Sequence, residues 1–398
     1  MKLGNHSELR PEDQLLICIA RRDLDESTIQ SIADLLNRDA FDWDYVSATA
    51  TSHGVAALLA HHLQSINCEV VPRSVLSRLQ TENQENSERC LWLAGELAKI
   101  AAGMQNAGIP CIPFKGPTLA ITAYRDLGLR QFTDLDLFVH TRDFARAKEV
   151  LAQHGFKPVR NLNSAREAAW LRFDNACAFD NGRDVLLDLH WRFSPVHFSL
   201  PLETNDFWRR LEQVNIGKQT LFSLSAEDLL LVLCCHGFTH QWQRLIWVCD
   251  VATLIGQRKN LDWNYLFRQA QRLGVLRIVL VGLTLAGELG ASLPQQVLDR
   301  LERNSEISRC AEEVMTQVFT PHKNHLNLFE WLRRQLQMRE RTRDKFISLL
   351  RITLTPRDYD LMFASVPASL SLLYYLIRPI RMARAYGLRL LNTGSTTN

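Results

Sequence analysis

Apolar residues in the first hundred positions recur every three or four residues, which is the spacing of one face of an α-helix. Shorter segments with this pattern precede Pro72, at residues 15–19, 29–36 and 55–63. A longer segment runs over 75–107, where Gly108 followed by Pro110 is a typical helix stop. The pattern therefore predicts a helical region over residues 1–108.

Between residues 109 and 193 short apolar runs replace this pattern. We expect strands at four places: Cys111–Phe114, Phe132–Val139, Cys177–Phe179 and Val185–Trp191. A helix is expected over Phe144–Leu151. The dipeptide Asn181-Gly182 supplies the positive φ angles of a tight turn, so the third and fourth strands are predicted to form an antiparallel hairpin. These elements predict a mixed β-sheet with helices.

After Phe193 the helical pattern returns. Helices are expected at Ala226–Ile255, Trp263–Leu273, Val275–Leu289, Pro294–Arg303, Leu328–Leu350 and Ser369–Leu391. The sequence thus predicts an α+β fold. A small mixed sheet at 109–193 is embedded between a helical N-terminal region at 1–108 and a helical C-terminal region at 194–391. Residues 392–398 are small and polar, and we expect them to form a flexible tail.

The composition is that of an ordinary globular protein. Of the 398 residues 46% are hydrophobic and 22% are charged, which excludes collagen-like, low-complexity and wholly disordered chains. The nine cysteines form no Cys-x-x-Cys motif, which is typical of thiols in a reducing compartment. The N-terminus lacks a signal-peptide pattern, and the most apolar stretch, 278–287, is shorter than the ~20 residues that span a bilayer. We therefore expect a cytoplasmic protein with no transmembrane segment.

The net charge of +3 identifies no partner, but the charge is unevenly distributed. Residues 332–398 contain twelve Lys and Arg against four Asp and Glu. An anionic partner, either nucleic acid or lipid, is one interpretation of this basic C-terminal region, and solvated helical faces are the other. Its last predicted helix carries arginines among aromatic and aliphatic residues. That helix fits either a membrane surface or a packed helix with arginines at its rim.

The stretch FTDLDLFV combines acidic residues with strand periodicity. Because alternate side chains of a strand share a face, Asp134 and Asp136 are expected on one face, and Leu135 and Leu137 on the other. Carboxylates ~7 Å apart along a strand repel each other, and a cation between them removes that repulsion. Hard oxygen ligands of this kind suit Mg²⁺.

The stretch VLLDLHW repeats the pattern and places Asp188 and His190 on one face. If this strand pairs with the first, Asp188 becomes a third carboxylate of the same cluster. Three carboxylates can hold two Mg²⁺ ions, which clamp a triphosphate and lower the pKa of an attacking hydroxyl. The alternative interpretation is a set of exposed strand residues.

The segment Lys115-Gly116-Pro117-Thr118 follows the first predicted strand and opens a predicted helix. Glycine allows the backbone to approach a phosphate closely, and the amide groups at a helix N-terminus favour an anion. Lys115 adds a positive charge. The segment is therefore a candidate phosphate-binding turn upstream of the carboxylates.

Together, the stretch FKGPTLAITAYRDLGLRQFTDLDLFV from Phe114 and the later LLDLHW from Leu186 resemble the nucleotidyltransferase superfamily of the DNA polymerase β type. More narrowly, residues 90–260 resemble a bacterial group of uncharacterised nucleotidyltransferase-like proteins. The resemblance implies Mg²⁺-dependent transfer of a nucleoside monophosphate from a nucleoside triphosphate to a hydroxyl or phosphate acceptor, with release of pyrophosphate.

The resemblance also implies roles for single residues. Asp134 and Asp136 would bind two metal ions, and Asp188 would bind the catalytic ion and help to deprotonate the acceptor hydroxyl. Gly116 would approach the triphosphate, and His190 would lie at the nucleotide. The acceptor, whether small molecule, protein or RNA, stays open.

Two departures from the superfamily pattern concern the first motif. Lys115-Gly116-Pro117 stands where Gly-Ser is usual, and Asp134 follows Gly116 by 18 positions, more than is usual. Lys115 and Thr118 are candidate substitutes for the missing serine. These departures motivate the alternative of a catalytically inactive protein that binds a nucleotide or a partner on the same fold.

The stretch HGFTHQWQRLIWVCD is expected to be helical and to place a polar stripe on one face. The stripe consists of His236, His240, Arg244, Trp247 and Asp250. The resemblance implies that such a helix walls the nucleotide pocket, with Trp247 on a base, Arg244 at a phosphate and His240 at a ribose or phosphate oxygen. A core helix is the alternative for this stretch, and it is favoured for His236 and Trp242. For His240, Arg244 and Asp250 both interpretations stay open. An ion pair is the favoured interpretation of Arg130.

Overall fold

The helical N-terminal region is confirmed by the computed structural model. The structure describes residues 9–38, 41–66, 70–160, 162–202, 205–319, 328–363, 366–381 and 384. Its first helices are α1 (Pro11–Ile19), α2 (Glu26–Arg38), α3 (Trp43–His53), α4 (Ala56–Ser65) and α5 (Arg73–Asn106). Helix α3 was not predicted, because its middle is rich in Ser and Thr and has few apolar positions. It begins where Asp42 accepts a hydrogen bond from the Tyr45 amide and ends at Gly54.

A mixed sheet forms the centre of the molecule, as predicted, and it has five strands where four were expected. Its strands are β1 (Cys111–Pro113), β2 (Asp134–Val139), β3 (Lys157–Pro158), β4 (Ala176–Asp180) and β5 (Leu186–His190). They lie in the order β1-β2-β5-β4-β3, and only β2 and β5 run parallel. The predicted antiparallel hairpin of β4 and β5 is confirmed, but its turn is longer than the tight turn expected: it spans residues 181–185, and the positive φ angles fall on Gly182 and Asp184, not on Asn181.

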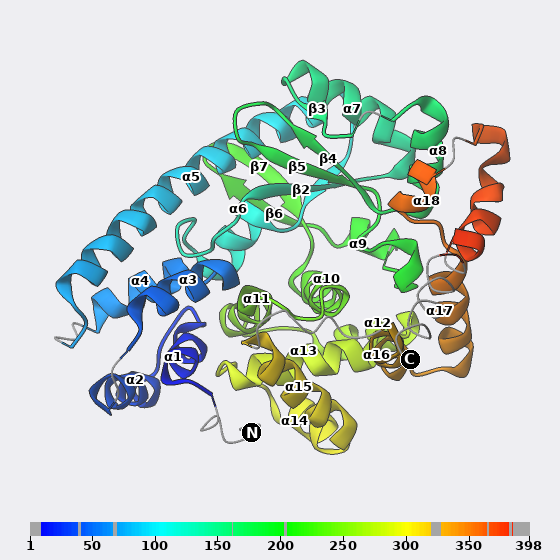
Figure 1. Ribbon diagram of the computed structural model, residues 1–398. Coiled ribbons are helices and arrows are strands. Elements are labelled where there is room, and N and C mark those ends of the chain that lie inside the picture. The colour runs from blue at the N-terminus through cyan, green and yellow to red at the C-terminus, as the bar shows by residue number, and fades with distance from the viewer. Residues whose placement is uncertain are drawn as a thin grey trace, which may run out of the picture.

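Each face of the sheet packs against a different set of helices. Leu135 and Leu137 of β2 and Leu187 and Leu189 of β5 are buried with α5 and α7 (Phe144–Gln153). The opposite face, which carries the acidic residues, is covered by helices from the C-terminal half of the chain. Figure 1 shows α5 along one side of the sheet and α10, α11 and α13 below it.

The remaining elements near the sheet are short. Helix α6 (Gly116–Leu119) continues into a π-helical turn over Ala120–Tyr124, and α8 (Ser164–Phe173) and α9 (Asn205–Arg209) follow later in the chain. The predicted return to helix after Phe193 is partly wrong. Strands β6 (Glu212–Ile216) and β7 (Gln219–Ser223) form a separate hairpin with Gly217 in its turn. They were missed because most of their outward positions are polar and their apolar runs are short.

The C-terminal half is otherwise helical. Its helices are α10 (Ala226–Thr239), α11 (Leu245–Gln257), α12 (Trp263–Leu273), α13 (Leu276–Glu288), α14 (Gln295–Glu302), α15 (Ser305–Val318), α16 (Leu328–Gln337), α17 (Thr342–Leu354) and α18 (Asp358–Phe363). A helix predicted over 328–350 is in fact two, α16 and α17. The helix predicted from 369 is described only as far as 381 and at 384, with a 3₁₀ turn over Ala368–Leu373 at its start. The predicted tail lies outside the described residues.

The prediction of one continuous helix over 226–255 is wrong, because the chain breaks between α10 and α11. Gln241 and Trp242 both have positive φ angles. The Trp242 ring folds back onto Gly237, where a Cβ atom would lie 2.4 Å from the ring. The glycine therefore makes room for a buried indole, and burying that indole offsets the strained backbone. His240 consequently caps α10, and Arg244 precedes α11.

No helix in the described part of the chain is both long and apolar enough to cross a bilayer. This agrees with the expectation for residues 278–287, which lie inside the buried helix α13.

One pH dependence of stability follows from His62, a buried residue of α4 whose Nε2 lies 2.8 Å from the backbone oxygen of Arg21. Burial lowers the pKa of His62 to about 4 from its usual 6.5. Between these values the unfolded chain binds a proton that the folded chain does not, so stability falls as the pH falls below about 6.5. Because of His62, the free energy of unfolding should be about 2 kcal/mol lower at pH 5 than at pH 8.

Urea unfolding of the wild type and His62→Gln at both pH values measures this effect. We expect His62→Gln to lose less stability between pH 8 and pH 5 than the wild type. An equal loss in both proteins would contradict the assignment.

Candidate metal and nucleotide site

Two neighbouring parallel strands bring the predicted carboxylates together. In the register of β2 and β5, Asp136 lies directly opposite Asp188. One ligand atom each of Asp136, Asp188 and His190 lies within 4.8 Å of the others. The pairing of these strands, on which the predicted cluster depends, is confirmed.

Asp134 lies on the same face, two residues before Asp136 at the start of β2, and is outside that closest group. Burial and the charge of Asp136 raise the pKa of Asp134, and the charge of Asp188 adds to this effect. The three carboxylates therefore act on one another electrostatically and form one acidic cluster.

Asp136 is the centre of this cluster and is only 7% exposed. Its Oδ1 atom lies 3.2 Å from the Nζ atom of Lys115 and 3.0 Å from the Nε2 atom of His190. Although burial opposes ionisation, Lys115 and His190 hold the pKa of Asp136 well below its usual range. Asp136 is thus an anion at any ordinary pH.

Asp188 differs from Asp136, because burial raises its pKa and the charge of Asp136 raises it further. Both polar contacts of Asp136 fall on its Oδ1 atom. Within the described residues, Asp134 and Asp188 accept no hydrogen bond. The Oδ2 atom of Asp136 and the carboxylates of Asp134 and Asp188 therefore keep oxygen atoms that fit a hard divalent cation.

The loop before the acidic cluster is shaped by glycine. Gly116 has a φ angle of +50°, and a Cβ atom there would lie 3.3 Å from the backbone oxygen of Asp134. The absence of a side chain thus lets this turn lie directly against the start of β2. The hydroxyl of Thr118 donates to the backbone oxygen of Lys115 at 2.7 Å and is buried. Thr118 therefore holds the loop that presents Lys115.

A group of aromatic rings from α10 and α11 lies near Lys115 and Asp136. The ring centroids of His236 and His240 are 4.5 Å apart, and those of His240 and Trp247 are 5.0 Å apart. Burial and the Lys115 charge lower the pKa of His236 well below its usual value, so its ring is neutral. Partial burial and the same lysine also lower the pKa of His240.

Sequence reasoning favoured a core position for His236, and the structure instead brings it to the edge of the acidic cluster. The signal was present in the four-residue spacing of His236 and His240, which puts both rings on one side of α10.

Arg244 and Asp250 are positioned differently from the predicted stripe. Arg244 is exposed, and its Nε atom donates to the backbone oxygen of Ser52 at 3.0 Å. Asp250 is 1% exposed and accepts from the Tyr124 hydroxyl and from Nε and Nη2 of Arg130, each at 2.8 Å. Asp250 therefore ties α11 to the loop before β2, and Arg130 forms the expected ion pair, though a buried one.

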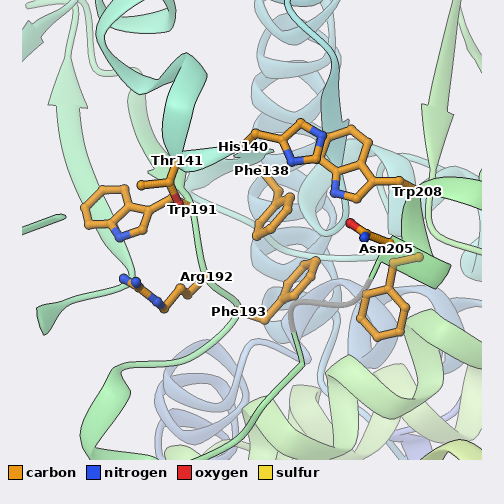
Figure 2. A pocket seen from close by; sticks show the side chains of 9 residues that line it. Phe138, His140, Thr141, Trp191, Arg192, Phe193, Asn205 and Trp208 are labelled. Atoms are coloured by element: carbon orange, nitrogen blue, oxygen red, sulfur yellow. The ribbon is translucent and has the colours of Figure 1, made fainter. Parts of the chain in front are cut away.

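An aromatic cavity of about 210 Å³ lies beyond the acidic cluster, where the parallel strands β2 and β5 end. It is lined by Phe138, His140, Thr141, Trp191, Arg192, Phe193, Asn205, Phe207 and Trp208. Figure 2 shows His140, Phe138 and Trp208 on one side of this space, and Trp191 and Arg192 on the other.

This cavity is close to the acidic cluster along the chain. Phe138 follows Asp136 by two residues on the same face of β2, and its ring stacks on Phe193 with centroids 4.3 Å apart. Phe114 contacts both Phe193 and His190 edge-on. The cavity was not predicted from the sequence, because one wall comes from α9, a short helix in a segment that had no assigned element.

The comparisons with known proteins agree with this geometry. A family model described as an uncharacterised nucleotidyltransferase matches residues 39–291. No curated protein matches the chain. The match covers the candidate phosphate-binding turn, the sheet with its acidic cluster, and helices α10 to α13. The chain therefore belongs to this family of uncharacterised nucleotidyltransferases.

Proposed function

We propose that this protein transfers a nucleoside monophosphate from a nucleoside triphosphate to a hydroxyl or phosphate group of an acceptor, in a reaction that requires Mg²⁺ and releases pyrophosphate. The observation that carries this proposal is the register of Asp136 against Asp188, with Asp134 and Lys115 beside them. Membership of a nucleotidyltransferase family supports it.

In this proposal Asp134, Asp136 and Asp188 hold two Mg²⁺ ions. When bound, the ions supply charge neutralisation for the triphosphate and lower the pKa of the acceptor hydroxyl. The acceptor oxygen forms a bond to the α-phosphorus, and the bond from that phosphorus to the bridging oxygen breaks. Asp188, which lies directly opposite Asp136 in the register of the two strands, takes the acceptor proton.

Lys115 and the turn at Gly116 lie at the triphosphate in this arrangement. Lys115 is the cation closest to Asp136, so it can move from that carboxylate to a phosphate oxygen once a divalent cation supplies the counter-charge. Trp247 and His240 wall the nucleotide, with Trp247 offering an aromatic face to a base. We also propose that Arg244 contacts a phosphate. Asp250 does not touch the nucleotide and acts by positioning Arg130.

The aromatic cavity is our proposed acceptor position. It continues the carboxylate face of β2 and β5, and its wall combines ring faces with polar groups of Arg192, Asn205 and Thr141. Such a lining suits a small molecule with an apolar face and several oxygen atoms.

One observation favours a second candidate, a nucleotide-binding protein without turnover. The ammonium group of Lys115 already provides a counter-charge to Asp136, and the Thr118 hydroxyl is used within its own turn. A cation competing with Lys115 would bind more weakly than at an unpaired acidic cluster.

Incubation of the purified chain with each α-phosphate-labelled nucleoside triphosphate, Mg²⁺ and a cell extract tests the proposal. We expect one labelled product that is missing without Mg²⁺ and with Asp188→Asn. Trp208→Ala should lose the product but keep nucleotide binding. Nucleotide binding by calorimetry with no pyrophosphate release for any acceptor would favour the second candidate instead.

A further inference from the structure

Helix α17 exposes an apolar stripe to solvent. Phe346, Leu349 and Leu350 are 66%, 41% and 46% exposed, and they recur at the spacing of one helix face. The opposite face, with Ser348 and Ile352, is buried. A stripe of large apolar side chains on the outer face of a helix is unusual unless something covers it.

Exposed cations flank this stripe in the described part of the chain. Arg343, Lys345 and Arg351 of α17 are all exposed. The carboxylate of Asp344 is turned inward, since a Cβ atom on Gly274 would lie 2.7 Å from its Oδ2 atom. Among the side chains that the structure describes between 341 and 381, no acidic group is exposed.

A second apolar row follows in the chain. Its exposed members are Leu370, Leu372, Leu373, Leu376 and Ile380. Arg378 fixes this segment to α17, because its guanidinium donates to the backbone oxygens of Ile352 and Thr353 and pairs with buried Asp360. Figure 1 shows α17 and this segment at the same edge of the molecule. The exposed apolar residues of α17 and of this segment together are called the C-terminal apolar edge below.

Arg378 itself is not at the rim of a packed helix, one of the two positions expected for the arginines of this segment, because it is only 3% exposed. Arg384 is exposed. Tyr374 of this segment is buried in the core, while its leucines and Ile380 face outward. The buried ion pair of Arg378 and Asp360 thus fixes a segment whose exposed row is apolar.

The chemistry of this edge selects among possible partners. A second copy of the chain, related by a twofold axis, would bring Arg343, Lys345 and Arg351 against themselves. A nucleic acid would pair with these cations but leave the leucines and Phe346 in water. A bilayer with anionic lipids satisfies both features, because apolar side chains enter the interface while the cations meet the headgroups.

We propose that the C-terminal apolar edge docks this protein on the surface of an anionic lipid bilayer. Phe346, Leu349 and Leu350 enter the boundary between headgroups and acyl chains, and Lys345 and Arg351 contact lipid phosphates. This surface is separate from the acidic cluster, so the proposal stands independently of the transfer reaction.

Co-sedimentation of the full chain with vesicles tests this proposal. We expect the wild type to sediment with vesicles that contain phosphatidylglycerol and to stay in solution with pure phosphatidylcholine. The double substitution of Phe346→Ser and Leu350→Ser should weaken binding at least about tenfold, because two exposed apolar side chains supply much of the affinity. Leu91→Ser is the control. Leu91 lies on α5 and is about as exposed as Phe346, and its variant should bind vesicles like the wild type.

Circular dichroism and the transfer assay confirm that each variant is folded. Three results would overturn the proposal: no sedimentation of the wild type with phosphatidylglycerol vesicles, equal binding by the double variant, or a dimer in solution that the same two substitutions dissociate.

Discussion

Replacing Asp136 by Asn should reduce nucleotidyl transfer by roughly a thousandfold or more, without unfolding the protein. Asp136 lies opposite Asp188, and its Oδ1 atom meets both Lys115 and His190. Asparagine keeps the size of the side chain but removes the negative charge. The acidic cluster then loses the one carboxylate whose pKa is held low, and a divalent cation loses a ligand that is always ionised.

The control for this substitution is Asp184→Asn. Asp184 is exposed just before β5 and has a φ angle of +59°, which asparagine tolerates as well as aspartate does. Initial rates of pyrophosphate release by the three proteins measure the effect. Wild-type turnover by Asp136→Asn would contradict the assignment of the acidic cluster.

The second large effect concerns stability. Replacing Asp250 by Ala should lower the free energy of unfolding by about 3–5 kcal/mol, because it leaves the guanidinium of Arg130 buried and unpaired. The hydroxyl of Tyr124 loses its acceptor as well. Urea unfolding followed by circular dichroism measures the change.

Two controls test whether the loss of stability comes from the buried, unpaired charge or from the removal of any aspartate. Asp23→Ala removes an ion pair with Arg22 at the surface and should change stability by less than about 1 kcal/mol. Combining Asp250→Leu with Arg130→Met removes both charges and should restore much of the stability lost in Asp250→Ala. If Asp250→Ala keeps its stability and loses nucleotide affinity, Asp250 belongs to the nucleotide site and not to this buried contact.

The acidic cluster was predictable because strand periodicity is local. Asp134 and Asp136 alternate with Leu135 and Leu137, so a short window of sequence assigns their faces. The Asn181-Gly182 signal is equally local and predicted the hairpin that contains Asp188, although the turn is longer than the tight turn expected.

Features that depend on contacts between distant segments were not predictable. The break before α11 arises because Trp242 packs over Gly237, and helical spacing continues through both residues. The ion pair of Arg130 and Asp250 joins residues 120 positions apart, so Asp250 was indistinguishable from a site residue. The aromatic cavity needs α9 beside the ends of β2 and β5, which no pattern within one segment records.

The most direct test of the central claim is Mn²⁺ binding, followed by electron paramagnetic resonance in the presence of a non-hydrolysable nucleoside triphosphate analogue. We expect the wild type to bind two Mn²⁺ ions per chain, and both Asp136→Asn and Asp188→Asn to weaken this binding at least about tenfold. Asp184→Asn should behave like the wild type. Equal Mn²⁺ affinity in all four proteins, or no binding by the wild type, would show that the carboxylates of β2 and β5 do not form a metal site.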